Sequence, residues 1–359
     1  NTSVTANGTT TTGGTVQIAG QDQTQLVASS VSANGVTVGG GVQIGINNTT
    51  GSGSTLAPPA RVAFSNSASL SSMTSLDSLS LVTANASPSA SATVATNSLT
   101  GASTASASTA SQAGQIYIAG NADLTTAAQI QANADQGGLV ILSSPAGTYQ
   151  NTGYIQTNGG AGLGGTIAQS GLISTTLLGA TLSANGTSGG GNIITGRDFQ
   201  AYPLPGSTSI AELLPVTSTI LSLPTSRLTS IDTTSSLTAN ATGVGHGGNV
   251  LVWGDVNTIA GALSAQALGT AGNGGFIETS GQTLSISDVS VITTASANGK
   301  VGTWLIDPND FYIAPSGGNV TGSALSSALN SNSVTINTNN VTTCSGVTCT
   351  SSTVTDRKS

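Results

Sequence analysis

The stretch Leu182-Ser183-Ala184-Asn185-Gly186 is a phrase that recurs throughout this chain. It consists of an aliphatic residue, a small polar residue, Ala or Thr, then Asn and in most copies Gly. The copies, some of them looser, are at residues 4–8, 31–35, 82–85, 130–133, 155–159, 182–186, 237–240 and 263–266. The spacing is 27 residues from Asn7 to Asn34 and again 27 from Asn158 to Asn185. A period near this length indicates a solenoid, in which each repeat stacks on the next.

A second phrase, two glycines followed by a short aliphatic run, keeps the same period. One example is Gly190-Gly191-Asn192-Ile193-Ile194. The second glycines are at positions 14, 41, 138, 165, 191, 248 and 275, which gives steps of 27, 27, 26 and 27 where no insertion intervenes. Two phrases that stay in phase are much harder to obtain by chance than one, so they support the solenoid interpretation.

The repeating units are expected to be strands. Charged residues make up only 5% of the chain, and its 48 glycines, with many Ser, Thr and Asn residues, disfavour helices. Val16 and Ile18 alternate with Gln17, which is typical of an extended segment with one buried face. We therefore predict an all-β fold, a parallel β-helix (β-solenoid) with about 26–27 residues per coil and three short strands in each. Asn-Gly and Gly-Gly pairs supply the backbone freedom that the corners need.

The whole chain, residues 1–359, is expected to form a single solenoid of roughly ten coils. It starts and stops within the repeat pattern, which suggests a fragment of a longer rod. Three stretches interrupt the period, near residues 45–80, 86–113 and 197–236. We interpret them as partial coils together with loops or hairpins that protrude at corners, and loops or hairpins alone are the alternative. The leucine-rich part of 197–236 is expected to pack on a flank of the rod.

Charge restricts the partners. The formal net charge is −7 and the chain has only six Lys and Arg residues, which argues against nucleic acid or an anionic membrane as the partner. No run of 18 apolar residues occurs, so the sequence predicts no transmembrane helix. Thin aliphatic layers suit a composition that is 37% hydrophobic but only 3% aromatic. Trp253 and Trp304 are expected to fill local widenings of the core.

Two motifs resemble a known family. Gly247-Gly248-Asn249-Val250-Leu251-Val252-Trp253-Gly254-Asp255 and Asn298-Gly299-Lys300-Val301-Gly302-Thr303-Trp304-Leu305-Ile306-Asp307-Pro308-Asn309-Asp310 look like parts of filamentous haemagglutinin exoproteins, large adhesins of two-partner secretion. The likeness is strongest over residues 247–336. It implies a right-handed parallel β-helix, export through an outer-membrane transporter, and display on the surface of a Gram-negative bacterium. The family's Asn-Pro-Asn motifs are absent, so the domain that engages the transporter is not expected within this sequence.

Two kinds of covalent site are candidates. Cys344 and Cys349 are close enough in sequence for a small disulfide loop in an oxidising compartment, and a reduced pair is the alternative. Among the Asn-x-Ser/Thr sequons, four fall on the recurring Asn corner, which we expect to be exposed and therefore open to glycosylation. These four are Asn7, Asn85, Asn185 and Asn240.

The sequence has few residues of the types that carry out catalysis, and we predict no enzymatic activity, no cofactor and no metal site. The single histidine, His246, lies between glycines, where a solvated side chain is expected. The alternative is a carbohydrate-active β-helix enzyme, which needs clustered carboxylates. Acidic residues are instead scattered, apart from Asp307 and Asp310, which we interpret as part of a turn, with weak calcium binding as the alternative. An ice-binding solenoid would need Thr-x-Thr in register on one flat face.

The sequence therefore favours a structural and adhesive rod at the cell surface, as part of a fibre that mediates adhesion, aggregation or biofilm formation. Uncharged Thr, Ser, Asn and Gln side chains repeated along one face would provide weak contacts that add through avidity. The partner would be a host or neighbouring-cell surface or a carbohydrate receptor. End-to-end or lateral self-association is also expected, because solenoids without polar caps tend to associate.

Overall fold

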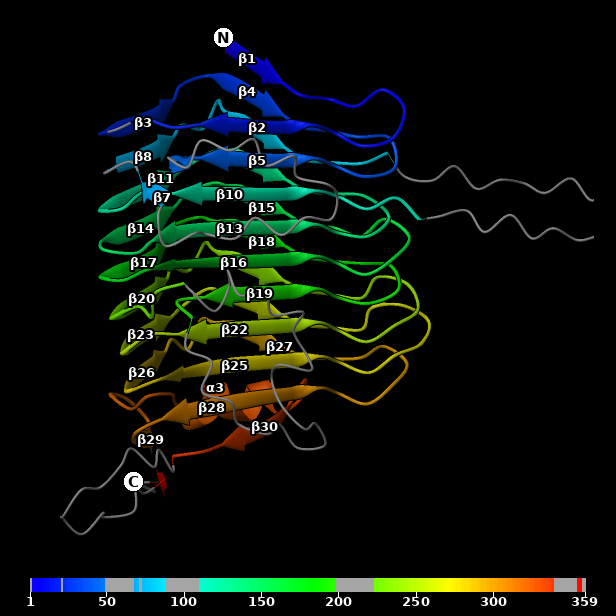
Figure 1. Ribbon diagram of the computed structural model, residues 1–359. Coiled ribbons are helices and arrows are strands. Elements are labelled where there is room, and N and C mark those ends of the chain that lie inside the picture. Colours follow the sequence, from blue (N-terminus) through cyan, green and yellow to red (C-terminus); the bar gives the residue numbers. More distant parts are fainter. Residues whose placement is uncertain are drawn as a thin grey trace, which may run out of the picture.

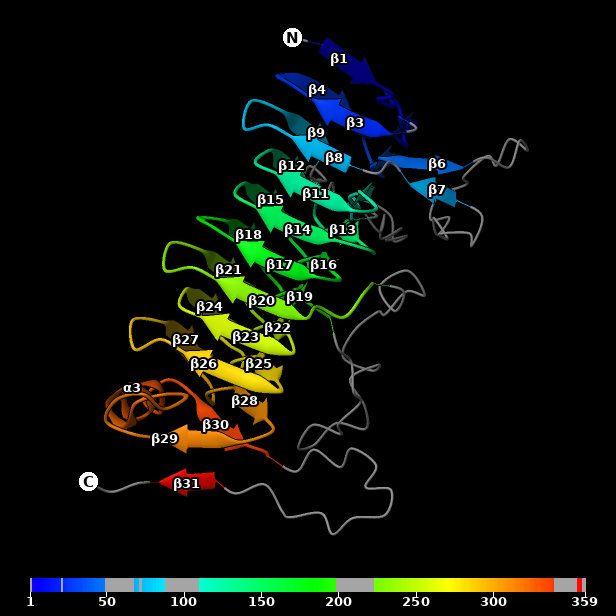
Figure 2. The ribbon, with the colours of Figure 1, turned by 90° about the vertical axis from the view of Figure 1, so that its left-hand side faces the viewer.

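The computed structural model describes residues 2–20, 22–48, 68–70, 73–87, 110–197, 223–338 and 354–356. Over these residues the chain winds into a column of stacked coils, with one strand of each coil on each of three long faces (Figures 1 and 2). Every pair of neighbouring strands in the three long sheets is parallel. The predicted parallel β-helix is thus confirmed.

The first sheet has nine strands. In spatial order they are β1 (Thr2–Thr5), β4 (Ser29–Ser32), β9 (Leu81–Thr83), β12 (Gln129–Gln131), β15 (Tyr154–Gln156), β18 (Thr181–Ser183), β21 (Ser236–Thr238), β24 (Ala262–Ser264) and β27 (Val291–Thr293).

The second sheet has ten strands and the third has eight. Those of the second sheet are β2 (Thr15–Ile18), β5 (Gly41–Ile44), β10 (Gln115–Ala119), β13 (Leu139–Ser144), β16 (Thr166–Gly171), β19 (Asn192–Thr195), β22 (Asn249–Trp253), β25 (Phe276–Gly281), β28 (Thr303–Pro308) and β30 (Ser333–Ile336). Those of the third are β3 (Gln23–Leu26), β8 (Met73–Leu76), β11 (Asp123–Thr126), β14 (Thr148–Asn151), β17 (Ser174–Leu177), β20 (Leu228–Ile231), β23 (Val256–Ile259) and β26 (Thr283–Ile286).

The coils are right-handed. In Figure 1 the strands of the second sheet run to the left at the front, and the chain then passes through the third sheet on the left. It returns to the right along the first sheet at the back, while successive coils descend from β1. A path that circles clockwise as it recedes is a right-handed helix, the hand favoured for connections between parallel strands.

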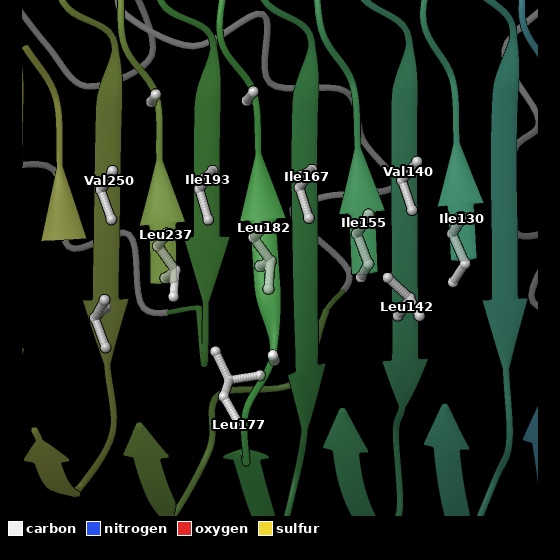
Figure 3. Close-up of a cluster of buried hydrophobic side chains, with 14 of the residues drawn as sticks. Ile130, Val140, Leu142, Ile155, Ile167, Leu177, Leu182, Ile193, Leu237 and Val250 are labelled. Atoms are coloured by element: carbon white, nitrogen blue, oxygen red, sulfur yellow. The ribbon is translucent and has the colours of Figure 1, made fainter. Parts of the chain in front are cut away.

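The core is a set of thin aliphatic layers, one for each coil. In β13, Val140 and Leu142 point inward and are fully buried, and the register places Val140 beside Ile167 of the next coil. Figure 3 shows the resulting rows, with Ile155 of the first sheet among the inward-pointing side chains. Each such side chain contributes about 1.5–3 kcal/mol through burial. Layers this thin have room for aliphatic side chains at most positions, as the composition suggested.

Bonding across one corner explains why the two recurring phrases keep a common period. In the same coil, the N–H of Gly191 donates to the carbonyl of Ala184 at 2.7 Å, and the equivalent bond joins Gly248 to Ala239 at 2.7 Å. The third residue of the Asn phrase is therefore tied to the second glycine of the glycine phrase. The two phrases therefore recur together in each coil, although the number of residues between them varies. Gly165 bonds to Thr157, eight positions earlier, whereas Gly114 bonds to Ala84, thirty positions earlier.

The second glycines also stack in a column from coil to coil. A Cβ on Gly165 would lie 2.1 Å from the carbonyl oxygen of Gly138, and one on Gly191 would lie 2.1 Å from that of Gly165. These distances are far below van der Waals contact. Close approach of neighbouring backbones therefore requires glycine in this column.

Parts of the predicted insertions belong to the coils. Strands β8 and β20 fall within the ranges 45–80 and 197–236, yet both are regular members of the third sheet. These two ranges therefore contain partial coils, in agreement with the expected partial coils plus protrusions. The first one begins as a hairpin, in which β6 (Ile46–Asn48) pairs in an antiparallel manner with β7 (Ala68–Leu70). The leucine-rich segment expected to pack on a flank lies largely outside the described residues.

A short helix corrects the expectation of strands alone. Helix α3 (Gly322–Ala328) follows β29 (Phe311–Ile313) and lies against β27, where the next strand of the first sheet would be. Thr321 is its N-cap and accepts a hydrogen bond from the Ala324 N–H. The sequence held this signal, a capping Thr followed by apolar residues at helical spacing, but the repeat pattern obscured it. The last described element, β31 (Val354–Asp356), pairs with β29.

One side chain takes the place of the missing strand beside β27. The Oδ1 of Asn332 accepts from the Thr294 N–H at 2.7 Å, and its Nδ2 donates to the Ile292 carbonyl at 2.8 Å. The carboxamide thus reproduces the two ladder bonds that a further coil would make. Asn332 is buried, so this polar edge is satisfied inside the protein.

Three aromatic residues test our packing expectations. Trp304 is 1% exposed and lies in the core, where its Nε1 donates to Thr279 Oγ1 at 3.0 Å. Trp253 is only half-buried, so our expectation of a core position is wrong for it. Tyr117 points away from the inner core, as its alternation with Ile116 predicts, but it is buried and not exposed. Its burial raises the pKa of the phenol.

Candidate interaction surfaces

The outer face of the third sheet carries a regular column of polar side chains. The third residue of every strand in this sheet points outward and carries a hydroxyl or an amide. In spatial order this set, which we call the hydroxyl–amide column, is Gln25, Ser75, Thr125, Gln150, Thr176, Ser230, Thr258 and Ser285. All eight side chains are exposed or half-buried. Neighbours in the column are separated by one strand spacing, about 4.8 Å.

Inward-facing polar side chains hold the backbone beneath this column. Thr175 and Thr229 are fully buried, and each bonds the corner between the second and third sheets. Thr175 Oγ1 accepts from the Gly171 N–H at 2.9 Å, and Thr229 Oγ1 donates to the Trp253 carbonyl at 2.5 Å. The strands that carry the column are thus fixed at one end by internal hydrogen bonds. A fixed backbone presents the outward side chains in a constant register, which lowers the entropy cost of binding.

The column itself carries no charge. The column beside it, formed by the first residue of each strand, has one acid, Asp123, and the rest are polar or apolar. Leu228 and Val256 in that neighbouring column are exposed by 41% and 45%. The face therefore combines hydroxyl and amide groups with exposed aliphatic patches. Such a surface suits a neutral ligand with hydroxyl groups and apolar faces better than a charged one.

A second surface is a groove along the glycine corner. It has a volume of about 640 Å³ and runs past the paired glycines of successive coils. Its polar lining includes Gln112, Gln136, Asn192, His246 and Asn249. Because the glycines carry no side chains, backbone forms much of its floor. Among the described residues that line this groove there is no carboxylate.

A third hollow lies at the end of the core, between α3 and the last layer. It has a volume of about 360 Å³ and is lined by apolar residues such as Ile292 and Trp304 and by hydroxyl groups of α3 such as Ser323 and Ser327. Among the described residues that line it, Asp288 is the one acid. The hollow follows from the local fold, since the helix fills the space beside β27 less completely than a strand would.

The recurring asparagines form a column of their own along the rod. The Oδ1 of each accepts a hydrogen bond from the backbone N–H of its counterpart in the next coil, at 2.7–2.9 Å. The members of this asparagine column are Asn7, Asn34, Asn85, Asn133, Asn158, Asn185 and Asn240, and the last bonds to the N–H of Gln266. The phrase from which we predicted the fold is thus a continuous hydrogen-bonded ladder.

The four candidate glycosylation sites belong to this column, and their exposure differs from our expectation. Asn7 is exposed, Asn85 and Asn185 are half-buried, and Asn240 is buried at 8% exposure. The Nδ2 of Asn185, the atom that a glycan would modify, donates to Ser183 and Thr238. Glycosylation stays a prediction at all four sites, and Asn7 is the one with the most open geometry.

The other candidate site residues either have a role in the fold or lie outside the described residues. His246 is exposed, as expected. Its Nδ1 also accepts a hydrogen bond from the Asn273 N–H at 2.9 Å, and this bond joins two neighbouring coils. Asp307 lies within β28, and the chain bends at Asn309 and Asp310, so the expected turn begins after Pro308 and does not include Asp307. Within the described ranges no three His, Cys, Asp or Glu side chains gather in a way that could hold a metal ion. Cys344 and Cys349 lie outside the described residues.

Two aspartates that the sequence analysis did not single out stabilise the corner between the third and first sheets. Asp77 accepts from Ser80 Oγ at 2.7 Å and from the Ala28 N–H, and these hydrogen bonds lower the pKa of its carboxyl. At Asp232, burial raises the pKa, but hydrogen bonds from Ser235 and the Gly179 N–H outweigh it and the pKa is lowered. Both carboxylates support the fold and are not paired with another acid. The shared Asp-x-x-Ser pattern was the available signal.

Comparisons with known proteins give a limited result. No protein-family model matches the chain, and no curated protein matches it. Among solved structures, the crystal structure of the HMW1 secretion domain from Haemophilus influenzae is similar, with a TM-score of 0.44 and 17% sequence identity. The similarity covers 82% of this chain and 64% of that one. Among the described residues, no helix is both long and apolar enough to cross a bilayer.

Proposed function

We propose that this chain is a non-enzymatic β-helical rod of a secreted exoprotein, and that it binds a cell surface or a carbohydrate receptor through the outer face of its third sheet. The observation that carries the proposal is the hydroxyl–amide column, eight uncharged hydrogen-bonding side chains in register on successive coils. A repeated ligand can contact many equivalent sites on such a face. Individually weak contacts then add to a firm attachment.

The physical chemistry of the rod supports a mechanical role. Each coil is bonded to its neighbours through all three sheets, the asparagine column and the glycine corner. Such contacts join nearest neighbours, so resistance to pulling and to proteases is distributed along the whole length. We propose a fibre at the surface of a Gram-negative bacterium, with adhesion, aggregation or biofilm formation as its outcome. Export through an outer-membrane two-partner transporter is part of this proposal.

The test is attachment of the purified chain to cells and to immobilised glycans. The variant carries Thr125→Lys, Gln150→Lys and Thr176→Lys, three neighbours in the hydroxyl–amide column. The control carries Gln129→Lys, Thr181→Lys and Ser236→Lys on the outer face of the first sheet. Both variants add the same charge to exposed or half-buried positions, so general electrostatic effects cancel in the comparison.

We expect the third-sheet variant to lose at least about tenfold in apparent affinity, because three adjacent contacts are lost together. The first-sheet variant should bind like the original chain. Equal binding by both variants, or a loss confined to the first-sheet variant, would contradict the proposed face. Release of oligosaccharides from a neutral or acidic polysaccharide by the chain would contradict the non-enzymatic role.

Self-association is the second part of the proposal. Strands β1, β2 and β3 are the edge strands of the three sheets at one end, and all four residues of β1 are exposed. Unpaired edges of this kind can accept further strands. We expect a concentration-dependent increase in rod length in light scattering and electron microscopy. A constant monomeric mass up to high concentration would contradict end-to-end association.

A further inference from the structure

The chain contains six Asn-Gly pairs, and five of them make the same pair of hydrogen bonds to the next coil. The asparagine Oδ1 accepts from a backbone N–H of the next coil, and the glycine N–H donates to the carbonyl of that same residue. These five are Asn7-Gly8, Asn34-Gly35, Asn158-Gly159, Asn185-Gly186 and Asn273-Gly274, with partners Asn34, Asn85, Asn185, Asn240 and Lys300. The bonds to Oδ1 are 2.7–3.0 Å long, and those from the glycine N–H are 2.8–3.0 Å long.

The sixth pair, Asn298-Gly299, lacks this arrangement. Both residues are exposed and lie in a bend between β27 and β28. The Nδ2 of Asn298 donates to the Gly269 carbonyl at 2.9 Å. Over the described part of the chain, the Gly299 N–H has no acceptor and the Asn298 Oδ1 has no donor.

The Asn298-Gly299 pair also lies in the last coil of the first sheet. In the uninterrupted coils the bonding partner lies 27 residues after the asparagine, as in Asn158 to Asn185. Counting 27 residues from Asn298 leads to Leu325, which is inside α3 and not in a coil. The helix therefore leaves Asn298-Gly299 without the neighbour that holds the other five pairs.

From this contrast we infer that Asn298 is a site of spontaneous deamidation, and that the β-helix protects the other five Asn-Gly pairs. In this reaction the backbone nitrogen of Gly299 attacks Cγ of Asn298, so the N–Cγ bond forms and the Cγ–Nδ2 bond breaks. The proton of the glycine N–H is transferred and Nδ2 leaves as ammonia. Water then opens the cyclic succinimide at either carbonyl and gives aspartate or isoaspartate. No enzyme, metal or oxidant is needed.

The bonded pairs are protected for two physical reasons. Attack requires a free glycine nitrogen, and in five pairs the glycine N–H is held by a ladder bond. Attack also requires rotation of the carboxamide toward that nitrogen, and in the same pairs the Oδ1 is held by the next coil. Reaction there must wait for local opening of two neighbouring coils. Glycine after asparagine is reactive because it has no Cβ to hinder closure of the ring.

The product would alter the end of the rod. Either product places a carboxylate at position 298, two residues before Lys300. Isoaspartate also lengthens the backbone by one carbon in the segment that leads to Lys300. That residue exchanges bonds with the preceding coil, through its N–H to Asn273 Oδ1 and its carbonyl to the Gly274 N–H. We expect modification to loosen this attachment locally.

The test is incubation of the purified full chain in ¹⁸O-labelled water at neutral and mildly alkaline pH, followed by proteolysis and mass spectrometry. Incorporated ¹⁸O marks each deamidated asparagine. We expect label at Asn298 at least about tenfold faster than at any of the five bonded pairs, the ratio that a local opening free energy of about 1.4 kcal/mol would give. The chain unfolded in urea should label at all six pairs at similar rates.

The matched control is Asn298→Gln, which keeps the amide but disfavours the five-membered ring. It should remove the label at position 298 and leave the other pairs unchanged. The inference would be overturned by comparable rates at all six pairs in the folded chain, or by a bonded pair reacting first. It would equally be overturned if Asn298 stayed unlabelled while the unfolded chain labelled readily.

Discussion

At the scale of single residues, the fold depends on how each buried polar group is satisfied. Thr157 occupies the Ala position of the recurring phrase and is fully buried, and its Oγ1 has no hydrogen-bond partner among the described residues. Thr175 is equally buried, but its Oγ1 accepts from the Gly171 N–H and pairs with Ser226 Oγ. The same residue type thus has opposite energetic consequences in two coils, because an unpaired buried hydroxyl costs free energy and a paired one does not.

Substituting valine at both positions should separate these two cases. Thr157→Val keeps the shape and removes the unpaired hydroxyl, so we expect the free energy of unfolding to rise by about 1 kcal/mol. Thr175→Val leaves the Gly171 N–H without its acceptor, so we expect a loss of about 1–3 kcal/mol. Thermal and urea unfolding followed by circular dichroism measure both. A loss of stability in Thr157→Val would show that its hydroxyl has a partner, such as an ordered water.

Acid pH should weaken the corners held by Asp77 and Asp232. Because the pKa of each carboxyl is lower in the folded chain than in the unfolded chain, the stabilisation is present above the unfolded pKa, about 3.9. It is lost as the pH falls through the folded pKa. We expect the melting temperature to be insensitive to these groups from about pH 7 to pH 5 and to decrease below about pH 4. The double variant Asp77→Asn and Asp232→Asn should be less stable at neutral pH and show a shallower acid limb.

At the scale of elements, each coil is closed and stacked through the glycine corner. The second glycine of each pair serves two bonds at once. Its N–H donates to a carbonyl of its own coil, as the Gly165 N–H does to Thr157. Its carbonyl accepts from the first strand residue of the next coil, as the Gly165 carbonyl does from the Asn192 N–H. Because both contacts bring neighbouring backbones close together, there is no space for a Cβ at the position of this glycine. Strand propensity alone does not explain these residues.

Two glycine substitutions test this role. Gly165→Ala would place a Cβ 2.1 Å from the Gly138 carbonyl oxygen, so we expect a loss of more than about 3 kcal/mol, or failure to fold. Gly41→Ala in β5 is the control. In this coil Gly40 is the stacked glycine that bonds to Ala33, and a Cβ on Gly41 would meet nothing closer than the Thr15 side chain at 3.9 Å. There we expect no loss and a gain of up to about 1 kcal/mol. Equal effects in unfolding experiments would contradict a steric origin.

At the scale of the whole molecule, charge and shape together set the kind of binding. Eight coils contribute to one polar face, and the chain has only six Lys and Arg and thirteen Asp and Glu residues. Long-range electrostatic steering is therefore weak, and recognition has to come from hydrogen bonds and apolar contacts repeated along the axis. The strength of attachment should then depend on how many coils engage the ligand.

Salt should consequently have little effect on attachment. Raising the ionic strength from about 0.05 to 0.5 M shortens the screening length several-fold, but it hardly affects hydrogen bonds between neutral groups. We expect the apparent affinity of the chain for a neutral glycan surface to change by less than about twofold across this range. Titrations on glycan-coated sensors at several salt concentrations measure it. A steep decrease with salt would indicate that charged groups carry the binding.

Much of the architecture could be predicted from sequence because it repeats. The asparagine phrase and the glycine pairs gave the period, the strand class and the stacking of glycines from coil to coil. Helix α3, by contrast, was missed because seven residues give a weak helical signal against the surrounding repeat. The hydroxyl–amide column was also not located, since it appears only when strands up to 54 residues apart, such as Thr176 and Ser230, are placed side by side.

The sequence by itself determined that this chain is a parallel β-helix, because each coil repeats the same short-range requirements of alternating side chains, a glycine corner and an asparagine ladder. Only the tertiary structure decided which side chains share a face, where the first sheet ends, and which of six similar Asn-Gly pairs lacks the two bonds to a following coil among the described residues. The physical reason is that register between coils is a long-range property. It depends on insertions and on α3, whose effects are not written in any single repeat.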